Sequence, residues 1–230
     1  MSTKQELRIA AIYTYLLSHN YASVNELVEE FNVSKSTIKR DLEEMEKKNM
    51  TDKVRGGTVI KLGQEDPPYS TKKNMDLSAK AAIGKAAAEL VEDDDVVLIL
   101  GGVTCFEVYK AIHAQNVTVF SINVETFTVV NEHVTHLYAL EGEVSARSGV
   151  INGIMTLQNL QRITPDKIFL STSLSEDYVL QCRTDREFAL VSAVAAMSAK
   201  KIFMADKAKI RPRPFSIVPL KEMDVFVTDI

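Results

Sequence analysis

The sequence predicts an α/β fold in two domains, an N-terminal winged helix-turn-helix at residues 1–60 and a C-terminal α/β domain at residues 76–230. Helical spacing, a tight turn and a basic hairpin follow one another in the first domain. A polar segment that contains prolines occupies residues 61–75 and indicates a linker. Beyond it, apolar strand-like runs alternate with helical stretches, which is typical of a mainly parallel sheet covered on both faces.

The first two helices are predicted from apolar spacing and from a capping pattern. Apolar residues recur at helical spacing and give the first helix a single apolar stripe, made of Ile9, Ile12, Tyr13, Leu16 and Leu17. Ser23, with Glu26 three residues later, forms a capping box that begins a second helix. We expect this second helix to bury Leu27, Val28 and Phe31.

A tight turn and a third helix come next. Asn32 tolerates a left-handed backbone, and Ser34 is placed to cap the third helix. The inward side chains of this helix are Ile38, Leu42 and Met45. Its basic and hydroxyl side chains therefore lie on the outer side near its N-terminal end, and a basic hairpin follows.

These outward side chains suit a recognition helix and wing that read DNA. Lys and Arg contact phosphates or guanine, and Ser and Thr make adaptable hydrogen bonds. The alternative for a basic helix face is an ordinary solvated surface, but the spacing, the turn and the hairpin agree here. We therefore predict that double-stranded operator DNA is bound by Ser34, Lys35, Ser36, Thr37, Lys39, Arg40, Lys53 and Arg55.

The C-terminal domain is predicted from six apolar runs and from the helical stretches between them. The strands are expected at Val96–Leu100, Val117–Ile122, His136–Leu140, Lys167–Ser171, Lys201–Ala205 and Asp224–Asp229. The helices are expected at Leu77–Val91, Thr104–Ala114, Val124–Glu132 and Asp185–Ala199.

Ligands of such a sheet bind beyond the carboxyl ends of its strands. There the sequence offers glycines and a hydroxyl before a helix, an amide after the second strand and a cation after the fifth, which could hold an anion together. The predicted effector-binding residues are Gly101, Gly102, Val103, Thr104, Asn123 and Lys209. The alternatives are a glycine pair that serves only the turn and a lysine that is ordinary surface charge.

The third helix and the wing resemble the DeoR family of bacterial sugar-metabolism repressors. The family pattern reads roughly V-S-x-x-T-I-R-R-D-L, followed by a wing that ends in H-G-G-A. This chain matches it from Val33 to Leu42 and at Arg55-Gly56-Gly57, with Lys39 for the first Arg, Arg55 for the wing His and Thr58 for the Ala. The resemblance implies a repressor that binds operator DNA and is released by a small phosphorylated sugar effector in its C-terminal domain.

The resemblance in the C-terminal domain is weaker. The family's D-S-G-T-T loop corresponds here to Leu100-Gly101-Gly102-Val103-Thr104, without the acidic residue, whereas its D-x-x-K survives as Asp206-Lys207-Ala208-Lys209. Its acidic residue in a late helix corresponds to Glu187. The other possibility is therefore a DNA-binding oligomer whose α/β domain has lost phosphosugar binding.

An enzyme is another possibility, because the resemblance implies a C-terminal fold like that of ribose-5-phosphate isomerase and the coenzyme A transferases. Asp206, Glu187 and Lys209 are the available catalytic groups. The missing carboxylate at Leu100 and the fused DNA-binding domain argue against turnover, so we expect no enzyme activity. Neither the cysteines nor the histidines have metal-ligand spacing, and we expect no metal and no cofactor.

Several expectations concern the whole chain. No signal peptide or membrane span is visible, so we expect a cytoplasmic protein without a membrane partner. One winged helix-turn-helix buries little surface on DNA, so we expect a homo-oligomer, dimer or larger. The chain stops at Thr228-Asp229-Ile230, where the family usually continues, so either this form is truncated or the fold ends one strand early.

Overall fold

The computed structural model describes residues 3–61 and 66–229, which divide after Leu77 into two compact units. Part of the predicted linker, residues 62–65, lies outside the described residues. Later residues of that linker belong to the first unit, because helix α4 (Tyr69–Lys72) contacts α1 and Met75 is buried in the first unit's core.

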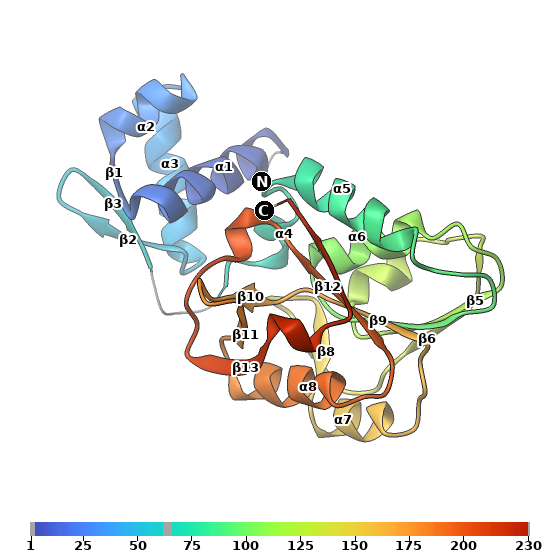
Figure 1. Cartoon of the computed structure of the whole chain (residues 1–230). Coiled ribbons are helices and arrows are strands. Elements are labelled where there is room, and N and C mark those ends of the chain that lie inside the picture. Colours follow the sequence, from blue (N-terminus) through green and yellow to red (C-terminus); the bar gives the residue numbers. More distant parts are fainter. Residues whose placement is uncertain (1–2, 62–65, 230) are drawn as a thin grey trace. The chain divides into compact units, whose positions relative to one another are not determined.

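The first unit is a winged helix-turn-helix (Figure 1). Its other elements are α1 (Thr3–His19), β1 (Tyr21–Ser23), α2 (Val24–Phe31), α3 (Lys35–Lys47), β2 (Thr51–Val54) and β3 (Gly57–Ile60). The strands form an antiparallel sheet in the order β1-β3-β2, and the wing is the hairpin β2–β3. Its core is made of the apolar sides of the three long helices, with Ile9, Ile12, Leu16, Leu27, Ile38 and Met45 buried.

The predicted caps of α2 and α3 are confirmed. The Ser23 side chain accepts the Glu26 N–H at 3.2 Å, and the Glu26 carboxylate accepts the Ser23 N–H at 2.6 Å. Asn32 has a φ of 47°, in the left-handed region. The Ser34 hydroxyl then accepts the Thr37 N–H at 3.2 Å. Helix ends leave N–H groups without helical partners, and these side chains satisfy some of them.

The two wing glycines have different structural reasons. Gly56, in the turn between β2 and β3, has a φ of +85°, which side chains with a Cβ rarely adopt. A Cβ on Gly57 would lie 2.2 Å from the Ala22 carbonyl oxygen, so only glycine allows β1 to pair this closely with β3.

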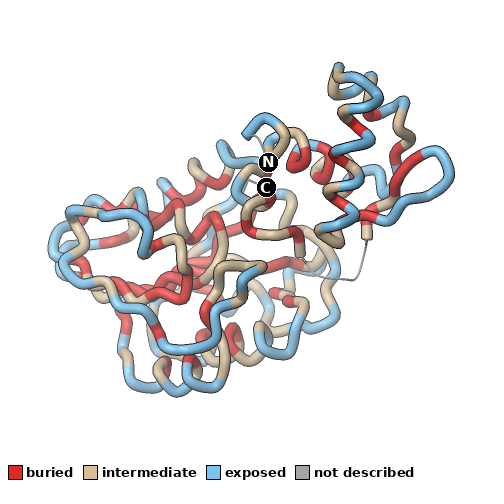
Figure 2. Tube along the Cα trace, turned by 180° about the vertical axis from the view of Figure 1, so that it is seen from behind, coloured by how far each residue is buried: buried red, intermediate tan, exposed pale blue. Residues whose placement is uncertain are grey.

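The second unit is built on a six-stranded sheet in which every neighbouring pair is parallel, in the order β14-β12-β9-β4-β5-β6. Its strands are β4 (Val96–Ile99), β5 (Val117–Ser121), β6 (Val134–Ala139), β9 (Lys167–Leu170), β12 (Lys200–Ala205) and β14 (Val225–Thr228). All six apolar runs of the sequence are therefore strands of one parallel sheet, as predicted. The central strand β9 is buried throughout, and its neighbour β4 is buried except at its first residue, Val96 (Figure 2).

Helices cover both faces of this sheet. Figure 1 shows α5 (Leu77–Ala88) and α6 (Val103–Ala111) on one side, and α7 (Ile154–Leu160) and α8 (Asp185–Ala195) on the other. Buried side chains of all four helices join the sheet in one apolar core, among them Ile83, Val108, Leu160 and Val191. The prediction of an α/β domain is confirmed, and α7 is an additional helix.

The predicted helix Val124–Glu132 is wrong. The structure has a short 3-10 helix, η1 (Val124–Thr128), and then irregular chain. Asn123 caps the start of η1 through its side chain, and the Asn131 amide donates to the carbonyls of Tyr109 on α6 and of Ile112 directly after it. Side-chain hydrogen bonds of this kind compete with an α-helix, and the β-branched residues of the segment favour it less.

Short elements around the carboxyl edge of the sheet were not predicted. These are the hairpin β7 (Glu143–Ser145) and β8 (Val150–Asn152), the strands β10 (Ser173–Leu174), β11 (Val179–Cys182) and β13 (Phe215–Pro219), and the 3-10 helices η2 (Lys207–Lys209) and η3 (Leu220–Glu222). β10, β11 and β13 form a second, small sheet.

Candidate DNA interface and candidate effector site

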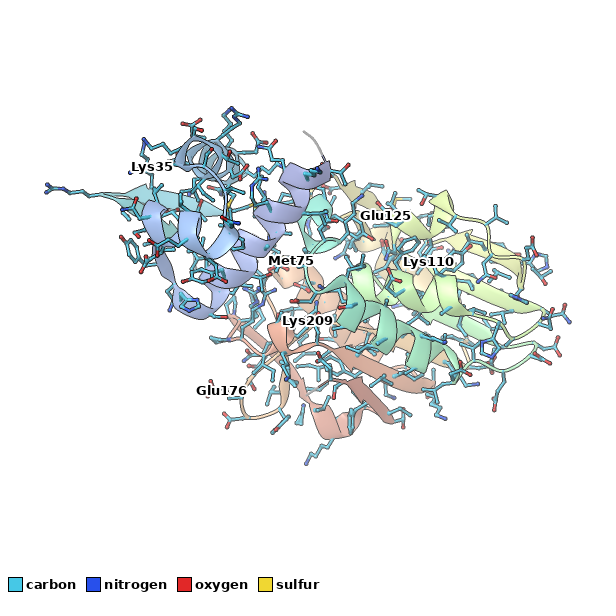
Figure 3. All side chains as sticks on the ribbon, turned by 90° about the horizontal axis from the view of Figure 1, so that it is seen from above. Lys35, Met75, Lys110, Glu125, Glu176 and Lys209 are labelled. Carbon is cyan, nitrogen blue, oxygen red and sulfur yellow. The ribbon has the colours of Figure 1, made fainter. Side chains whose placement is uncertain are left out.

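The outer side of α3 carries the basic residues selected from the sequence. Lys35, Ser36, Lys39 and Arg40 are all exposed, whereas Ile38 and Met45 are fully buried on the inner side. Figure 3 labels Lys35 at the first turn of this helix. The register of α3 is therefore the predicted one, and its cations face solvent.

These side chains form two columns along α3, because residues four apart lie above one another on a helix. Lys35 and Lys39 line a groove of about 510 Å³ between α3 and the hairpin, and Lys53 lines its opposite wall. Arg40 belongs to the other column, with Ser36. The groove column can hold a phosphate backbone, and the second column can reach base edges.

The groove changes the sign of its charge along α3. Glu43 and Glu46 line it beyond Lys39, toward the C-terminal end of the helix. Phosphates are attracted to the cations and repelled by these carboxylates. This charge pattern favours insertion of the N-terminal half of α3, the usual reading end of a recognition helix.

Two of the predicted DNA-binding residues are already used in the cap of α3. The Ser34 hydroxyl lies 2.8 Å from the Thr37 hydroxyl and 2.9 Å from the Ser36 hydroxyl. Ser34 and Thr37 therefore shape the first turn, and the exposed Ser36 can turn toward DNA. In the wing, Lys53 and Arg55 are exposed, and Arg55 lies at the hairpin turn.

Asp41 holds the inner side of α3, a role that was not predicted from the sequence. Its carboxylate is fully buried and pairs with Arg8 of α1, and the Gln5 amide donates to it at 3.2 Å. The sequence did contain a signal for this buried role, because Asp41 follows Ile38 by three residues and therefore lies on the inward side of the helix. This ion pair fixes the recognition helix on α1.

The candidate effector site lies where the strand order of the large sheet reverses. From β4 the chain adds β5 and β6 toward one edge, and β9, β12 and β14 extend the sheet toward the other. Ligands of open α/β sheets bind at such a switch point, beyond the carboxyl ends of the strands. The loop after β4, which contains Gly101 and Gly102, lies there.

The two glycines of this loop are required for different structural reasons. A Cβ on Gly101 would lie 2.4 Å from the Val150 side chain, so the loop packs tightly on β8. Gly102 has a φ of +105° and open space where a Cβ would be. It begins α6, and no side chain of the described residues caps that helix start. The first N–H groups of α6 are thus oriented for an anion.

The remaining loop residues contribute mainly through their backbone. Val103 and Thr104 are buried. Asn123 is also fully buried: its amide donates to the Gly102 carbonyl at 2.9 Å, and its side-chain oxygen accepts the Glu125 N–H. The structure thus brings Asn123 together with the glycine loop, where it holds the loop in shape.

Lys209 lies in η2, directly after β12 (Figure 3). Burial raises the pKa of the Cys105 thiol to about 12, and the positive charge of Lys209 opposes part of this increase. A charge acts on a buried thiol in this way only from nearby. The charge of Lys209 is therefore within electrostatic reach of Cys105, which lies in the first turn of α6.

Buried polar groups complete this edge. Both carboxylate oxygens of Asp206 are buried and accept no hydrogen bond from the described residues, although the Lys80 ammonium lies 3.5 Å from one of them. The Ser171 hydroxyl, after β9, is likewise buried without a hydrogen bond within the described part of the chain. Lys80 was not predicted as a site residue. The signal in the sequence was its helical spacing, since it lies three residues before Ile83 and seven before Ala87, both of which are buried.

Comparison with known proteins agrees with both units. The profile of a DeoR-like helix-turn-helix domain matches residues 8–62, and that of the DeoR C-terminal sensor domain matches residues 75–230. The lactose phosphotransferase system repressor of Staphylococcus epidermidis is 27% identical, over 89% of this chain and 84% of its own length. The HTH-type transcriptional repressor GlcR of Bacillus subtilis is 24% identical, over 98% and 88%.

Among solved structures, ribose 5-phosphate isomerase from Plasmodium falciparum matches 58% of this chain and 53% of its own, with 17% identity and a TM-score of 0.40. Within the described residues, no helix is long and apolar enough to cross a membrane. The relatives above are transcriptional regulators, which confirms the expectation of a regulator rather than an enzyme. With a DNA-binding unit and a sensor unit that both match, this chain belongs to the DeoR family of DNA-binding transcriptional regulators.

Proposed function

We propose that the protein represses sugar-metabolism genes by binding operator DNA through α3 and the β2–β3 hairpin, and that a phosphorylated sugar releases it. The matched relatives support this proposal, since one is named as a repressor of a lactose phosphotransferase system. The exposed basic columns of α3 and the wing support the DNA half of the proposal.

The effector half rests on two neighbouring features: α6 begins without a side-chain cap, and the charge of Lys209 acts on Cys105 in the first turn of that helix. Backbone N–H groups at a helix N-terminus bind phosphate, and a nearby cation strengthens those hydrogen bonds. The sugar hydroxyls then need acceptors. Asp206 supplies a buried carboxylate for them. This carboxylate compensates for the absence of the acidic residue that the family has at the position of Leu100.

Release from DNA needs a difference in affinity. A ligand that binds the DNA-bound and the free arrangements equally well shifts no equilibrium, however tightly it binds. The effector must therefore bind better to the arrangement that leaves the operator.

The test is a thermal-shift and calorimetric titration of the full chain with phosphorylated sugars, followed by operator release measured by fluorescence anisotropy. A ligand that binds only the folded protein raises its melting temperature. Lys209→Gln is expected to weaken binding by about tenfold, the loss of one charge-assisted contact. Lys207→Gln is the matched control, because Lys207 is exposed on the same 3-10 helix.

If the wild type binds a phosphosugar and both variants bind it equally well, the anion lies elsewhere. If none of the phosphorylated sugars binds, the effector half of the proposal is wrong. The alternative hypothesis would then hold, in which the chain is a DNA-binding oligomer without a phosphosugar ligand.

A further inference from the structure

Strand β6 forms one edge of the large sheet, and the function proposed above leaves that edge unused. Within the described residues, β5 is its one neighbouring strand. The Leu140 N–H donates to the Ser121 carbonyl of β5 at 3.0 Å. Backbone groups of a strand alternate between its two sides, so the N–H and C=O groups of Leu137 and Ala139 point away from β5. These groups are oriented to pair with a further strand.

This edge lacks the features that keep other sheet edges from pairing. Natural edge strands are commonly short, or they carry lysine, proline or a bulge. β6 has six residues, and none of them is Asp, Glu, Lys, Arg or Pro. Its register shift lies at its start, and from His136 to Ala139 it pairs regularly with β5. An exposed edge of this kind indicates an interface between two strands.

Aromatic side chains extend this surface onto one face of the sheet. Tyr138 is 48% exposed, and its ring stacks on that of Phe120 in β5, with the ring centroids 5.0 Å apart. The ring of His136, which is exposed, lies 6.0 Å from that of Tyr138. The open edge therefore carries an apolar surface, which the side chains of a further strand would remove from water.

We propose that β6 pairs antiparallel with β6 of a second copy of this chain, so that two six-stranded sheets join edge to edge. Pairing of a strand with its own copy is isologous and ends at a dimer, because each copy occupies the open edge of the other. Pairing of β6 with β14 of another copy would instead leave an edge open and continue into a filament. A two-fold axis perpendicular to the sheet keeps Tyr138 and His136 of both copies on one face, where they stack across the junction.

A second copy is favoured over an unrelated partner because the chain belongs to a family of DNA-binding regulators. One winged helix-turn-helix covers little of a duplex, and helix-turn-helix units pair on two half-sites. The two copies must then be joined by contacts outside their DNA-reading surfaces, and the β6 edge of the second unit provides one. The DNA-binding unit alone requires this second copy, whichever ligand the sensor unit binds.

The test is sedimentation of the full chain without DNA over a series of concentrations. The wild type is expected to form a dimer. Tyr138→Lys places a charge at the junction and is expected to weaken self-association by about tenfold or more. Phe226→Lys is the matched control, because Phe226 is 47% exposed on β14, the other edge strand of the same sheet. This control is expected to leave the dimer unchanged.

A second variant tests the backbone pairing itself. Ala139→Pro removes an N–H that points away from β5, so the sheet of one copy keeps its hydrogen bonds while a partner strand is blocked. It is expected to dissociate the dimer as Tyr138→Lys does, and the Leu137 N–H is expected to exchange its hydrogen more slowly in the wild type than in either variant. Thermal unfolding and binding to a duplex with one half-site confirm that each variant folds.

A wild type that stays monomeric throughout the series would overturn this inference and leave the edge to a strand of another protein. Dimers of Tyr138→Lys and Ala139→Pro that are as tight as those of the wild type would also overturn it. A loss of the dimer in Phe226→Lys but not in Tyr138→Lys would assign the contact to β14 instead.

Discussion

Arg40 and Arg55 are both exposed cations of the DNA-binding unit, but their positions predict different effects. Arg40 lies on the column of α3 that we propose reads base edges, so Arg40→Ala is expected to weaken operator binding by about 1–3 kcal/mol and binding to unrelated DNA only slightly. Arg55 lies at the wing turn, so Arg55→Ala is expected to weaken all sequences similarly and to reduce the salt dependence.

Anisotropy titrations with operator and scrambled duplexes at two salt concentrations measure both effects. Lys47→Ala is the control, because Lys47 is an exposed cation in the last turn of α3. Operator isotherms that coincide for wild type and Arg40→Ala would rule out this docking mode.

Substitution of Asp41 is expected to lower the stability of the fold strongly rather than to remove a contact with DNA. Asp41→Ala leaves the Arg8 guanidinium without its buried partner, and breaking such a pair costs about 3 kcal/mol. The double variant Arg8→Met/Asp41→Leu is expected to recover most of this loss, because an apolar pair of similar volume replaces the ions. Denaturant unfolding of the full chain, followed by circular dichroism, measures the free energy of unfolding of each variant. Glu43→Ala is the control, because Glu43 is exposed on the same helix. A double variant no more stable than Asp41→Ala would refute the account.

At the scale of single elements, the capping box of α2 predicts a dependence on pH. The backbone hydrogen bond from Ser23, and then its side chain, lower the pKa of Glu26 from its ordinary value of 4.5. A lowered pKa in the folded state means that the charged form stabilises the fold above the ordinary value. This stability is lost as the pH falls through the lowered pKa.

Glu26→Gln is therefore expected to lower the melting temperature at pH 7, and this difference is expected to shrink as the pH falls through the lowered pKa. Glu29→Gln, on the exposed part of the same helix, should show little difference across this range. A melting-temperature difference that stays constant from pH 7 to pH 2.5 would show that the Glu26 charge does not stabilise the cap.

The elements that sequence could predict are those with a strong local signal. Ser23, Asn32 and Ser34 act on their own neighbours, and the buried strands are long apolar runs, so both were predicted correctly. Val124–Glu132 failed because Asn123 and Asn131 form their hydrogen bonds with a loop and with α6, which no local pattern reveals. β10, β11 and β13 are short, and their pairing depends on residues far apart in the chain.

The candidate sites divide in the same way. The exposed cations of α3 follow from the period of one helix, so the sequence was sufficient to select them. At the effector edge, Lys80 and Asp206 come from segments more than a hundred residues apart, and only the parallel sheet brings them within 3.5 Å.

At the scale of the whole molecule, we expect a dimer or larger assembly on DNA. A single winged helix-turn-helix buries roughly 600–1,000 Å² on a duplex, too little for tight discrimination, so two units on repeated half-sites are needed. Sedimentation of the full chain with operator duplexes of one and two half-sites measures this. A strictly monomeric complex on the two-half-site duplex would contradict it.

The two separate cores have a consequence for protein engineering and for evolution. The buried cluster of the first unit ends at Met75 and that of the second begins at Ile83, and the two share no residue. An exchange of residues 1–77 for the same segment of a relative therefore interrupts neither core. Such a chimera would keep its sensor unit and acquire a new set of target promoters, so the genes that a lineage controls and the signal to which it responds can change independently.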